Sequence, residues 1–116
     1  MEKILAVDFD GVIHGYQSGW QGPQATDDPP VPGVRPFLEE MSNDYRIVIH
    51  STRAETKAGV IAIYNYLREH HLYFDEITHL KPPARVYLDD RAMLFTGSFD
   101  GLPEKIRKFR TWHNAI

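Results

Sequence analysis

Two aspartates one residue apart, Asp8 and Asp10, end an apolar run and are followed directly by Gly11. Side chains at positions i and i+2 of an extended strand point to the same side, so these two carboxylates are expected to project together from the strand end. In an open α/β sheet, ligands bind at the carboxyl ends of the strands. The pair therefore predicts a site that binds a cation.

Polar residues follow three further predicted strands in the same way. In chain order they are Ser51 and Thr52 after 45–50, Lys81 after 77–80, and Asp89 with Asp90 after 85–88. The carboxyl ends of parallel strands share one sheet edge, so we expect these groups to meet there. Hard oxygen ligands in a chain without cysteine favour Mg²⁺ over Zn²⁺. The sequence thus predicts a magnesium site with a hydroxyl and an ammonium group beside it.

Strand-like and helix-like patterns alternate along the chain, which predicts a parallel sheet. We expect an α/β fold with a three-layer, Rossmann-like arrangement, a central parallel sheet of about five strands and helices on both faces. The predicted strands are 3–8, 45–50, 77–80, 85–88 and a short fifth at 93–95, and the predicted helices are 34–43, 54–71 and 103–113.

The segment 15–33 differs in composition from the rest of the chain. It is rich in glycine and proline and contains Trp20 among polar residues. Long structureless insertions in a small domain are usually functional. We therefore expect 15–33 to form a loop or flap that covers or borders the site.

Length and composition limit the classes of protein to consider. A chain of 116 residues with 42% hydrophobic residues fits one domain over 1–116 with a single core. The net charge of −3 argues against nonspecific nucleic-acid binding, and the basic cluster at 105–110 fits a solvated helix face. The chain shows no signal-peptide pattern and no apolar stretch long enough for a membrane span. We expect a cytoplasmic protein that does not bind membranes.

Taken in order, these residues resemble the motifs of the haloacid dehalogenase superfamily of phosphohydrolases. The matching segments are Asp8-Phe9-Asp10-Gly11-Val12, Ile47-Val48-Ile49-His50-Ser51, Lys81, and Val86-Tyr87-Leu88-Asp89-Asp90. The resemblance spans roughly residues 3 to 95 and includes small phage and bacterial members of uncertain substrate. An ordered set of four motifs is far more specific than any one of them.

The resemblance implies an Mg²⁺-dependent phosphatase that works through an aspartyl-phosphate. Asp8 would be the nucleophile, Asp10 the acid and base, Ser51 a phosphate ligand and Lys81 a neutralising charge. The metal ligands implied are Asp8, the backbone carbonyl of Asp10, Asp89 and Asp90. Further residues expected to border the substrate are Gly11, His14, Thr52 and Arg53.

The spacing of the motifs leaves no room for the cap domain that larger members of this superfamily carry. An open, capless site favours a bulky substrate such as a nucleic-acid end or a protein. The substrates that we expect for the enzyme are a nucleotide, a phosphorylated nucleic-acid 3′ end or a sugar phosphate. A homo-oligomer in which a neighbouring subunit covers the site is a further possibility. The alternative function is a noncatalytic or phosphoacceptor binding domain of the same architecture.

Several single residues keep a structural interpretation beside the functional one. Ser51 or Thr52 could cap the following helix, and Lys81 could be a solvated loop lysine. Arg91 is expected to form a salt bridge, and His113 to be an ordinary core or surface histidine.

Overall fold

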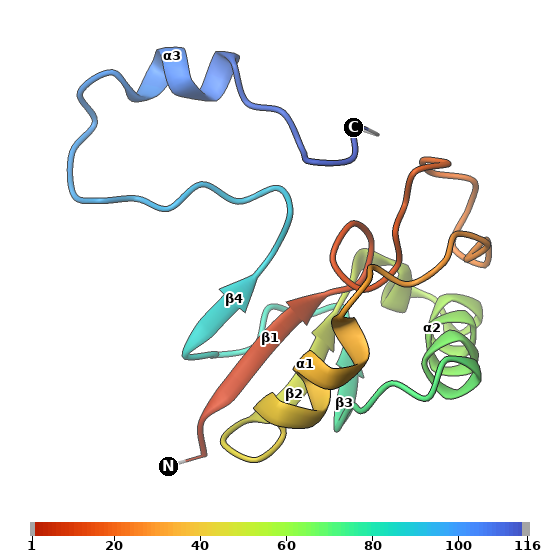
Figure 1. Cartoon of the computed structure of the whole chain (residues 1–116). Helices are drawn as coiled ribbons and strands as arrows, with labels where there is room; N and C mark the ends of the chain where they lie inside the picture. Colours follow the sequence, from red (N-terminus) through yellow and green to blue (C-terminus); the bar gives the residue numbers. More distant parts are fainter. Residues whose placement is uncertain (1, 115–116) are drawn as a thin grey trace.

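The computed structural model describes residues 2–114, which form a four-stranded, all-parallel sheet with helices. The elements are β1 (Ile4–Asp8), α1 (Val34–Met41), β2 (Arg46–His50), the 3₁₀ helix η1 (Thr52–Glu55), α2 (Lys57–Glu69), β3 (Glu76–Thr78), β4 (Val86–Leu88) and α3 (Leu102–Arg107). The strand order is β3-β2-β1-β4 (Figure 1). The predicted α/β class and parallel sheet are confirmed.

The two central strands, β1 and β2, end level with each other. Their register pairs Asp8 with His50, and β4 pairs Leu88 with Val7 on the other side of β1. The residues that follow β1, β2 and β4 therefore leave the sheet at the same edge. This register brings chemically active groups together although they are far apart in the sequence.

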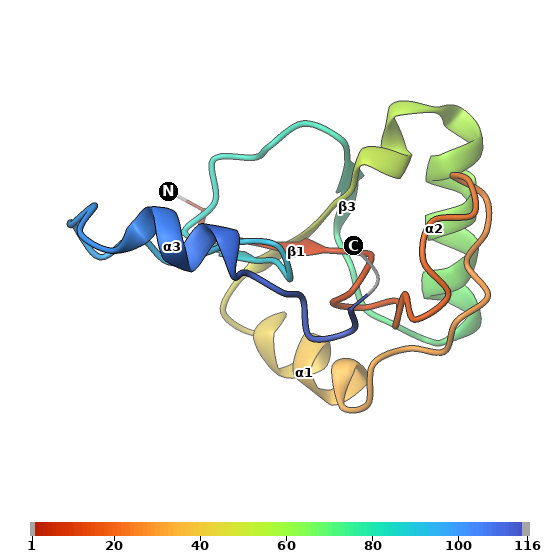
Figure 2. The same ribbon diagram turned by 90° about the horizontal axis from the view of Figure 1, so that it is seen from above.

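Both long helices cover the same face of the sheet. Alternate residues of β1 and β2, with Leu38 of α1 and Ile63 of α2, form one core cluster. This arrangement is expected for two successive right-handed crossovers that step in the same direction along a sheet. Figure 2 shows the segment between β3 and β4 on the side of the sheet opposite α1.

The structure thus differs from the predicted arrangement with helices on both faces. The β3–β4 connection contains Lys81-Pro82-Pro83 and forms no helix. Proline lacks a backbone N–H and disfavours helical backbone in the residue before it. Instead, the Tyr87 hydroxyl donates to the carbonyl of Pro82 at 2.5 Å, which ties the connection to β4.

Residues 93–95 do not form the expected fifth strand. They belong to an arm, residues 91–110, that projects away from the sheet and carries α3 (Figure 1). Leu94 is 87% exposed and Phe99 is 76% exposed, so these side chains do not pack against the sheet. The helix predicted to run to residue 113 ends at Arg107, and the chain then turns back toward the sheet.

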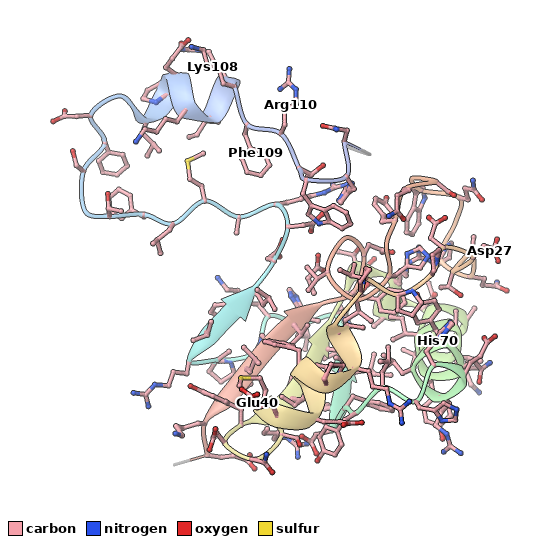
Figure 3. The ribbon with its side chains drawn as sticks, viewed as in Figure 1. Asp27, Glu40, His70, Lys108, Phe109 and Arg110 are labelled. Carbon is pink, nitrogen blue, oxygen red and sulfur yellow. The ribbon has the colours of Figure 1, made fainter. Side chains whose placement is uncertain are left out.

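The predicted basic cluster lies on this arm. Arg107 and Lys108 approach Glu104 at 3.7 and 3.2 Å, and all three side chains are exposed. Lys108 and Arg110 lie at a distance from the sheet in Figure 3. The cluster is a solvated surface, as the sequence predicted.

No cap domain is present among the described residues. The interval from β1 to α1 holds only irregular chain with isolated bridges, and the interval from β2 to β3 holds η1 and α2. None of the helices within residues 2–114 has the length and apolar character needed to cross a membrane.

Candidate functional site

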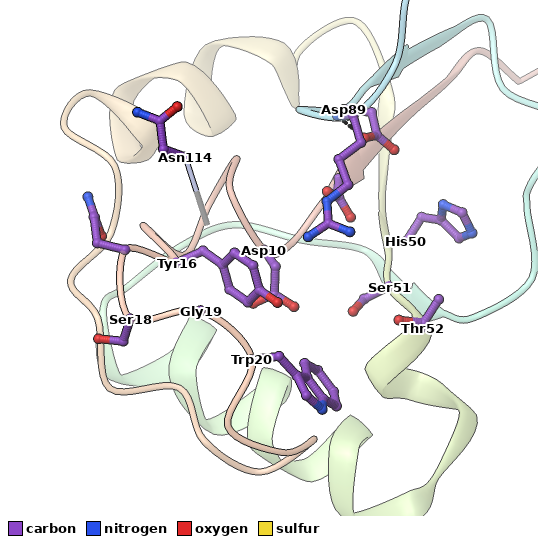
Figure 4. A pocket seen from close by; sticks show the side chains of 13 residues that line it. Asp10, Tyr16, Ser18, Gly19, Trp20, His50, Ser51, Thr52, Asp89 and Asn114 are labelled. Atoms are coloured by element: carbon purple, nitrogen blue, oxygen red, sulfur yellow. Dashed lines mark hydrogen bonds between the residues drawn. The ribbon is translucent and has the colours of Figure 1, made fainter. Parts of the chain in front are cut away.

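A pocket of about 850 Å³ opens at the carboxyl edge of the sheet (Figure 4). Its lining combines the ends of β1, β2 and β4 with the flap and the C-terminal tail: Asp8, Asp10, Tyr16, Gln17, Ser18, Gly19, Trp20, His50, Ser51, Thr52, Asp89, Arg91 and Asn114. The structure therefore brings together five predicted site residues from three strand ends. The flap 15–33 borders the pocket, as predicted.

Three carboxylates at this edge lie close enough together to hold one cation. Asp8, Asp89 and Asp90 each offer an oxygen, and these atoms lie within 4.8 Å of one another. Oδ1 of Asp90 is buried, and when Asp8 is ionised no hydrogen-bond donor from residues 2–114 reaches it. A buried acceptor without a donor is costly, and a cation would satisfy it. The donor set, all oxygen, fits Mg²⁺.

The acidic surroundings strongly perturb Asp8. Burial of its side chain, followed by the hydrogen bond with Asp90 and the charges of Asp89, Asp90 and Asp10, raises its pKa to about 9. Without a cation, Asp8 therefore holds a proton at neutral pH. A divalent cation would favour the ionised form, so metal binding and deprotonation of Asp8 are coupled.

The raised pKa of Asp8 predicts that the stability of the metal-free protein depends on pH. The folded chain keeps a proton on Asp8 that the unfolded chain loses near pH 4, so the stabilisation decreases as pH rises from about 4 to 9. With EDTA present, we expect the free energy of unfolding of Asp8→Asn, relative to that of wild type, to increase by up to about 1.4 kcal/mol for each unit of rising pH. Urea unfolding of both proteins at pH 6, 7 and 8 measures this. Parallel curves for the two proteins would contradict it.

Asp10 has a different environment from Asp8. Its carboxylate forms a bidentate ion pair with Arg53, at 2.7 Å to Nε and 3.0 Å to the terminal nitrogen, and contacts Nδ1 of His14 at 3.1 Å. Burial acts to raise the pKa of Asp10, but the hydrogen bonds from His14 and Arg53 and their charges outweigh it and lower the pKa. Asp10 is therefore ionised at neutral pH.

The tautomer of His14 follows from its two contacts. The backbone N–H of Asp28 donates to Nε2 of His14 at 3.1 Å, so Nε2 carries no proton. The proton of a neutral His14 must then reside on Nδ1, from which it is donated to Asp10. His14 is buried behind Asp10 and does not line the pocket.

Arg53 links the site to the flap. Its side chain is fully buried, and besides the ion pair it donates hydrogen bonds to the carbonyls of Gly22 and Pro23, both at 3.0 Å. Its guanidinium also lies over the ring of Trp20, 4.9 Å from the centroid. The sequence predicted that Arg53 contacts substrate. The structure differs from this prediction, because the Arg53 side chain is surrounded by protein and has no exposed surface.

A glycine in α2 allows Arg53 to take this position. A Cβ at Gly59 would overlap the backbone carbonyl of Arg53, so glycine permits η1 and the first turn of α2 to approach closely. The N–H of Gly59 donates to Oγ1 of Thr56, which caps α2. Gly59 therefore interrupts the helical pattern of the sequence because a larger side chain would not fit against the backbone of Arg53.

Ser51 and Thr52 both line the pocket but differ in exposure. Ser51 is buried, and its Oγ accepts the N–H of Arg53 at 3.2 Å, which caps η1. Its own O–H remains available to donate to a ligand oxygen. Thr52 is exposed at the pocket wall. The capping and ligand-binding interpretations of Ser51 are therefore compatible.

Lys81 and Gly11 lie outside the pocket lining, as do His14, Arg53 and Asp90. The ammonium group of Lys81 lies over the ring of Tyr87, 4.7 Å from its centroid. Gly11 has φ +82°, and a Cβ there would overlap the carboxylate of Asp90 and the ring of His113. Gly11 is thus required for close packing around Asp90.

The C-terminal tail contributes residues that sequence reasoning missed. Nε2 of His113 contacts Oδ2 of Asp90 at 2.5 Å, and Nε1 of Trp112 donates to the carbonyl of Gly11 at 2.6 Å. Tyr16 and Arg91 also line the pocket. The guanidinium of Arg91 lies 6.0 Å from the centroid of the Tyr16 ring. No local pattern marks these residues, because their partners are distant in the sequence.

Comparison of the chain with protein-family models, with curated proteins and with solved structures finds no match.

Proposed function

We propose that this chain is an Mg²⁺-dependent phosphomonoester hydrolase with a haloacid dehalogenase-like topology that works through an aspartyl-phosphate. The observation that carries the proposal is the cluster of Asp8, Asp89 and Asp90 at one strand edge, with Oδ1 of Asp90 buried and, when Asp8 is ionised, without a donor. The cluster borders a pocket in which the Ser51 hydroxyl can donate to an anion. A carboxylate nucleophile, a cation site and a hydroxyl donor together fit phosphoryl transfer.

The residues divide the reaction between them. An oxygen of Asp8 bonds to phosphorus while the bond to the leaving alkoxide breaks, and the alkoxide takes a proton. Water then attacks the aspartyl-phosphate, which releases phosphate and restores Asp8. Asp8, Asp89, Asp90 and the Asp10 carbonyl would hold Mg²⁺, which would supply positive charge against the anionic oxygens. Ser51 donates to a phosphoryl oxygen, and Lys81 is proposed to neutralise charge there.

Asp10 is proposed as the proton carrier. Because Arg53 and His14 hold it ionised, it is suited to accept a proton from the attacking water. It can return that proton to the leaving group of the next substrate. His14, with its proton on Nδ1, orients the Asp10 carboxylate for this exchange.

Phosphate release across a panel of substrates tests this function. The panel contains p-nitrophenyl phosphate, nucleotides, sugar phosphates and 3′-phosphorylated oligonucleotides, each with Mg²⁺ and with EDTA. Turnover that requires metal supports the proposal. Absence of turnover on every member, with Mg²⁺ still bound, would overturn it.

The two hydroxyls at the end of β2 give a matched pair of variants. We expect Ser51→Ala to lower kcat/KM by about 10²-fold, because it removes a buried donor to the phosphoryl group. Thr52→Ala should change it by less than about threefold, because exposed Thr52 is hydrated. Steady-state kinetics on the best substrate compares them. The reverse order of effects would assign the phosphate contact to Thr52.

A phosphoacceptor domain is the second candidate, and the state of Asp10 favours it. A group that must protonate a leaving alcohol benefits from a raised pKa, whereas the pKa of Asp10 is lowered. If Asp8 accepted a phosphoryl group and Asp10 activated water poorly, the aspartyl-phosphate would persist. Stoichiometric phosphorylation without turnover, measured by intact mass after reaction with acetyl phosphate, would identify this function.

The proposal extends to partners and location. A small-molecule phosphate ester or a phosphorylated nucleic-acid end fits the open pocket. We also propose a homo-oligomer in which a neighbouring subunit covers the open site, and a cytoplasmic location.

A further inference from the structure

Trp20 is the large aromatic side chain that the flap exposes at the pocket. It is 55% exposed, although the same flap buries Tyr16. Figure 4 shows its indole at the pocket wall, beside Asp10 and facing the space in front of Ser51. An exposed indole at the wall of a polar pocket offers an apolar, π-rich surface to a ligand.

The protein holds this indole in place before any ligand arrives. The guanidinium of Arg53 lies over the Trp20 ring, and the same guanidinium is fixed by Asp10 and by two flap carbonyls. The flap is further tied to α2 by the hydroxyl of Tyr66, which donates to the Asp28 carbonyl at 2.9 Å. A preorganised aromatic ring loses little entropy when a second ring stacks on it.

We infer that Trp20 is a stacking surface for a nucleobase, so that the substrate is a phosphate monoester of a nucleoside. This inference rests on the proposed phosphatase function. The phosphorus must reach Asp8 at the sheet edge, whereas Trp20 lies on the flap at the pocket wall. In a nucleotide the ribose separates the base from the phosphate, which suits such a divided site. A pocket of about 850 Å³ is large enough for a ligand of this size.

The same base-bearing group occurs in a mononucleotide and at a phosphorylated nucleic-acid end. Arg91 lines the pocket and could meet a further phosphate, but the chain carries a net charge of −3. Comparing kcat/KM at two salt concentrations distinguishes a mononucleotide from a nucleic-acid end as the substrate. The substrates compared are AMP, 3′-AMP and a short 3′-phosphorylated oligonucleotide. The proposal concerns the base, and preference for any of the three supports it.

The decisive comparison uses AMP and ribose 5-phosphate, which differ only in the base. We expect wild type to prefer AMP in kcat/KM, and Trp20→Leu to lower kcat/KM for AMP on the order of tenfold while leaving ribose 5-phosphate within about twofold. Trp20→Phe should retain part of the preference. Equal kcat/KM for the two substrates in wild type, or equal losses in Trp20→Leu, would overturn the inference and leave the phosphatase function intact.

Two controls separate stacking from other effects. Phe99→Leu removes an exposed aromatic ring outside the pocket and should leave both kcat/KM values unchanged. On p-nitrophenyl phosphate, whose ring is bonded directly to the phosphate oxygen, Trp20→Leu should have less effect than on AMP. A loss on p-nitrophenyl phosphate as large as that on AMP would overturn the assignment to a nucleobase.

Binding can be measured without turnover. In Trp112→Phe the fluorescence reports on Trp20, since the chain has two tryptophans. We expect AMP to quench this emission in the presence of Mg²⁺ and ribose 5-phosphate not to do so. Quenching by AMP without hydrolysis of any substrate in the panel would support the nucleobase site and reject the phosphatase function. Hydrolysis without base-dependent quenching would support the phosphatase function and reject the nucleobase site.

Discussion

Replacing Asp8 with Asn is expected to lower the rate of phosphate release by more than about 10³-fold. An amide cannot form the acyl-phosphate bond, and it also removes an anionic oxygen from the cluster with Asp89 and Asp90. The effect should appear in kcat as well as in kcat/KM, because the lost bond forms only during the reaction. Stopped assays for inorganic phosphate with the best substrate of the panel measure it.

A matched control shows whether the loss is specific. Asp100→Asn removes a carboxylate from the exposed arm and should retain full activity. The raised pKa of Asp8 implies that Asp8→Asn is more stable than wild type above neutral pH in EDTA. If unfolding measurements show this, misfolding does not explain a loss of activity in Asp8→Asn. Residual activity within about tenfold of wild type would exclude Asp8 as the nucleophile.

Replacing Arg53 with Met is expected to cost about 3–5 kcal/mol in the free energy of unfolding. The substitution leaves Asp10 without its bidentate partner and removes the donors to the carbonyls of Gly22 and Pro23. Arg53→Lys keeps the charge but cannot form all of these contacts, so it should recover only part of the loss. Urea unfolding measures all three proteins.

The matched control is Arg35→Met, which breaks an exposed ion pair with Glu39 and should cost less than about 1 kcal/mol. Thermolysin should also cleave within residues 15–33 faster in Arg53→Lys than in wild type, because the flap loses its anchor. Equal stability and equal cleavage in the Arg53 variants and wild type would show that the flap is held by other contacts. In that case Arg53 would not be what holds Trp20 in place.

In the proposed function, the buried side chain of Arg53 would serve both stability and chemistry. It neutralises Asp10, holds the flap backbone and supports the ring of Trp20. A change at this position is therefore expected to alter stability, the protonation of Asp10 and the pocket wall together. Its effects should not add to those of Trp20 or Asp10 variants.

The sequence by itself determined the strands, their polar ends and hence much of the site. Apolar runs that end in Asp8, Ser51 and Asp89 mark parallel strands that end at one edge, although only β1 and β2 are buried and β4 is exposed. Local composition also marked 15–33 as irregular chain. These features depend on residues close together in the chain, so pattern and propensity were sufficient.

Only the tertiary structure decided what surrounds those groups. The pairing of Arg53 with Asp10, the return of His113 to Asp90 and the position of Lys81 against Tyr87 each depend on how the chain turns after an element ends. The same holds for the missing fifth strand and the uncovered arm. Such contacts join residues that are separated by long loops, and their energies arise from burial and geometry. Neither quantity is encoded in the local spacing of residue types.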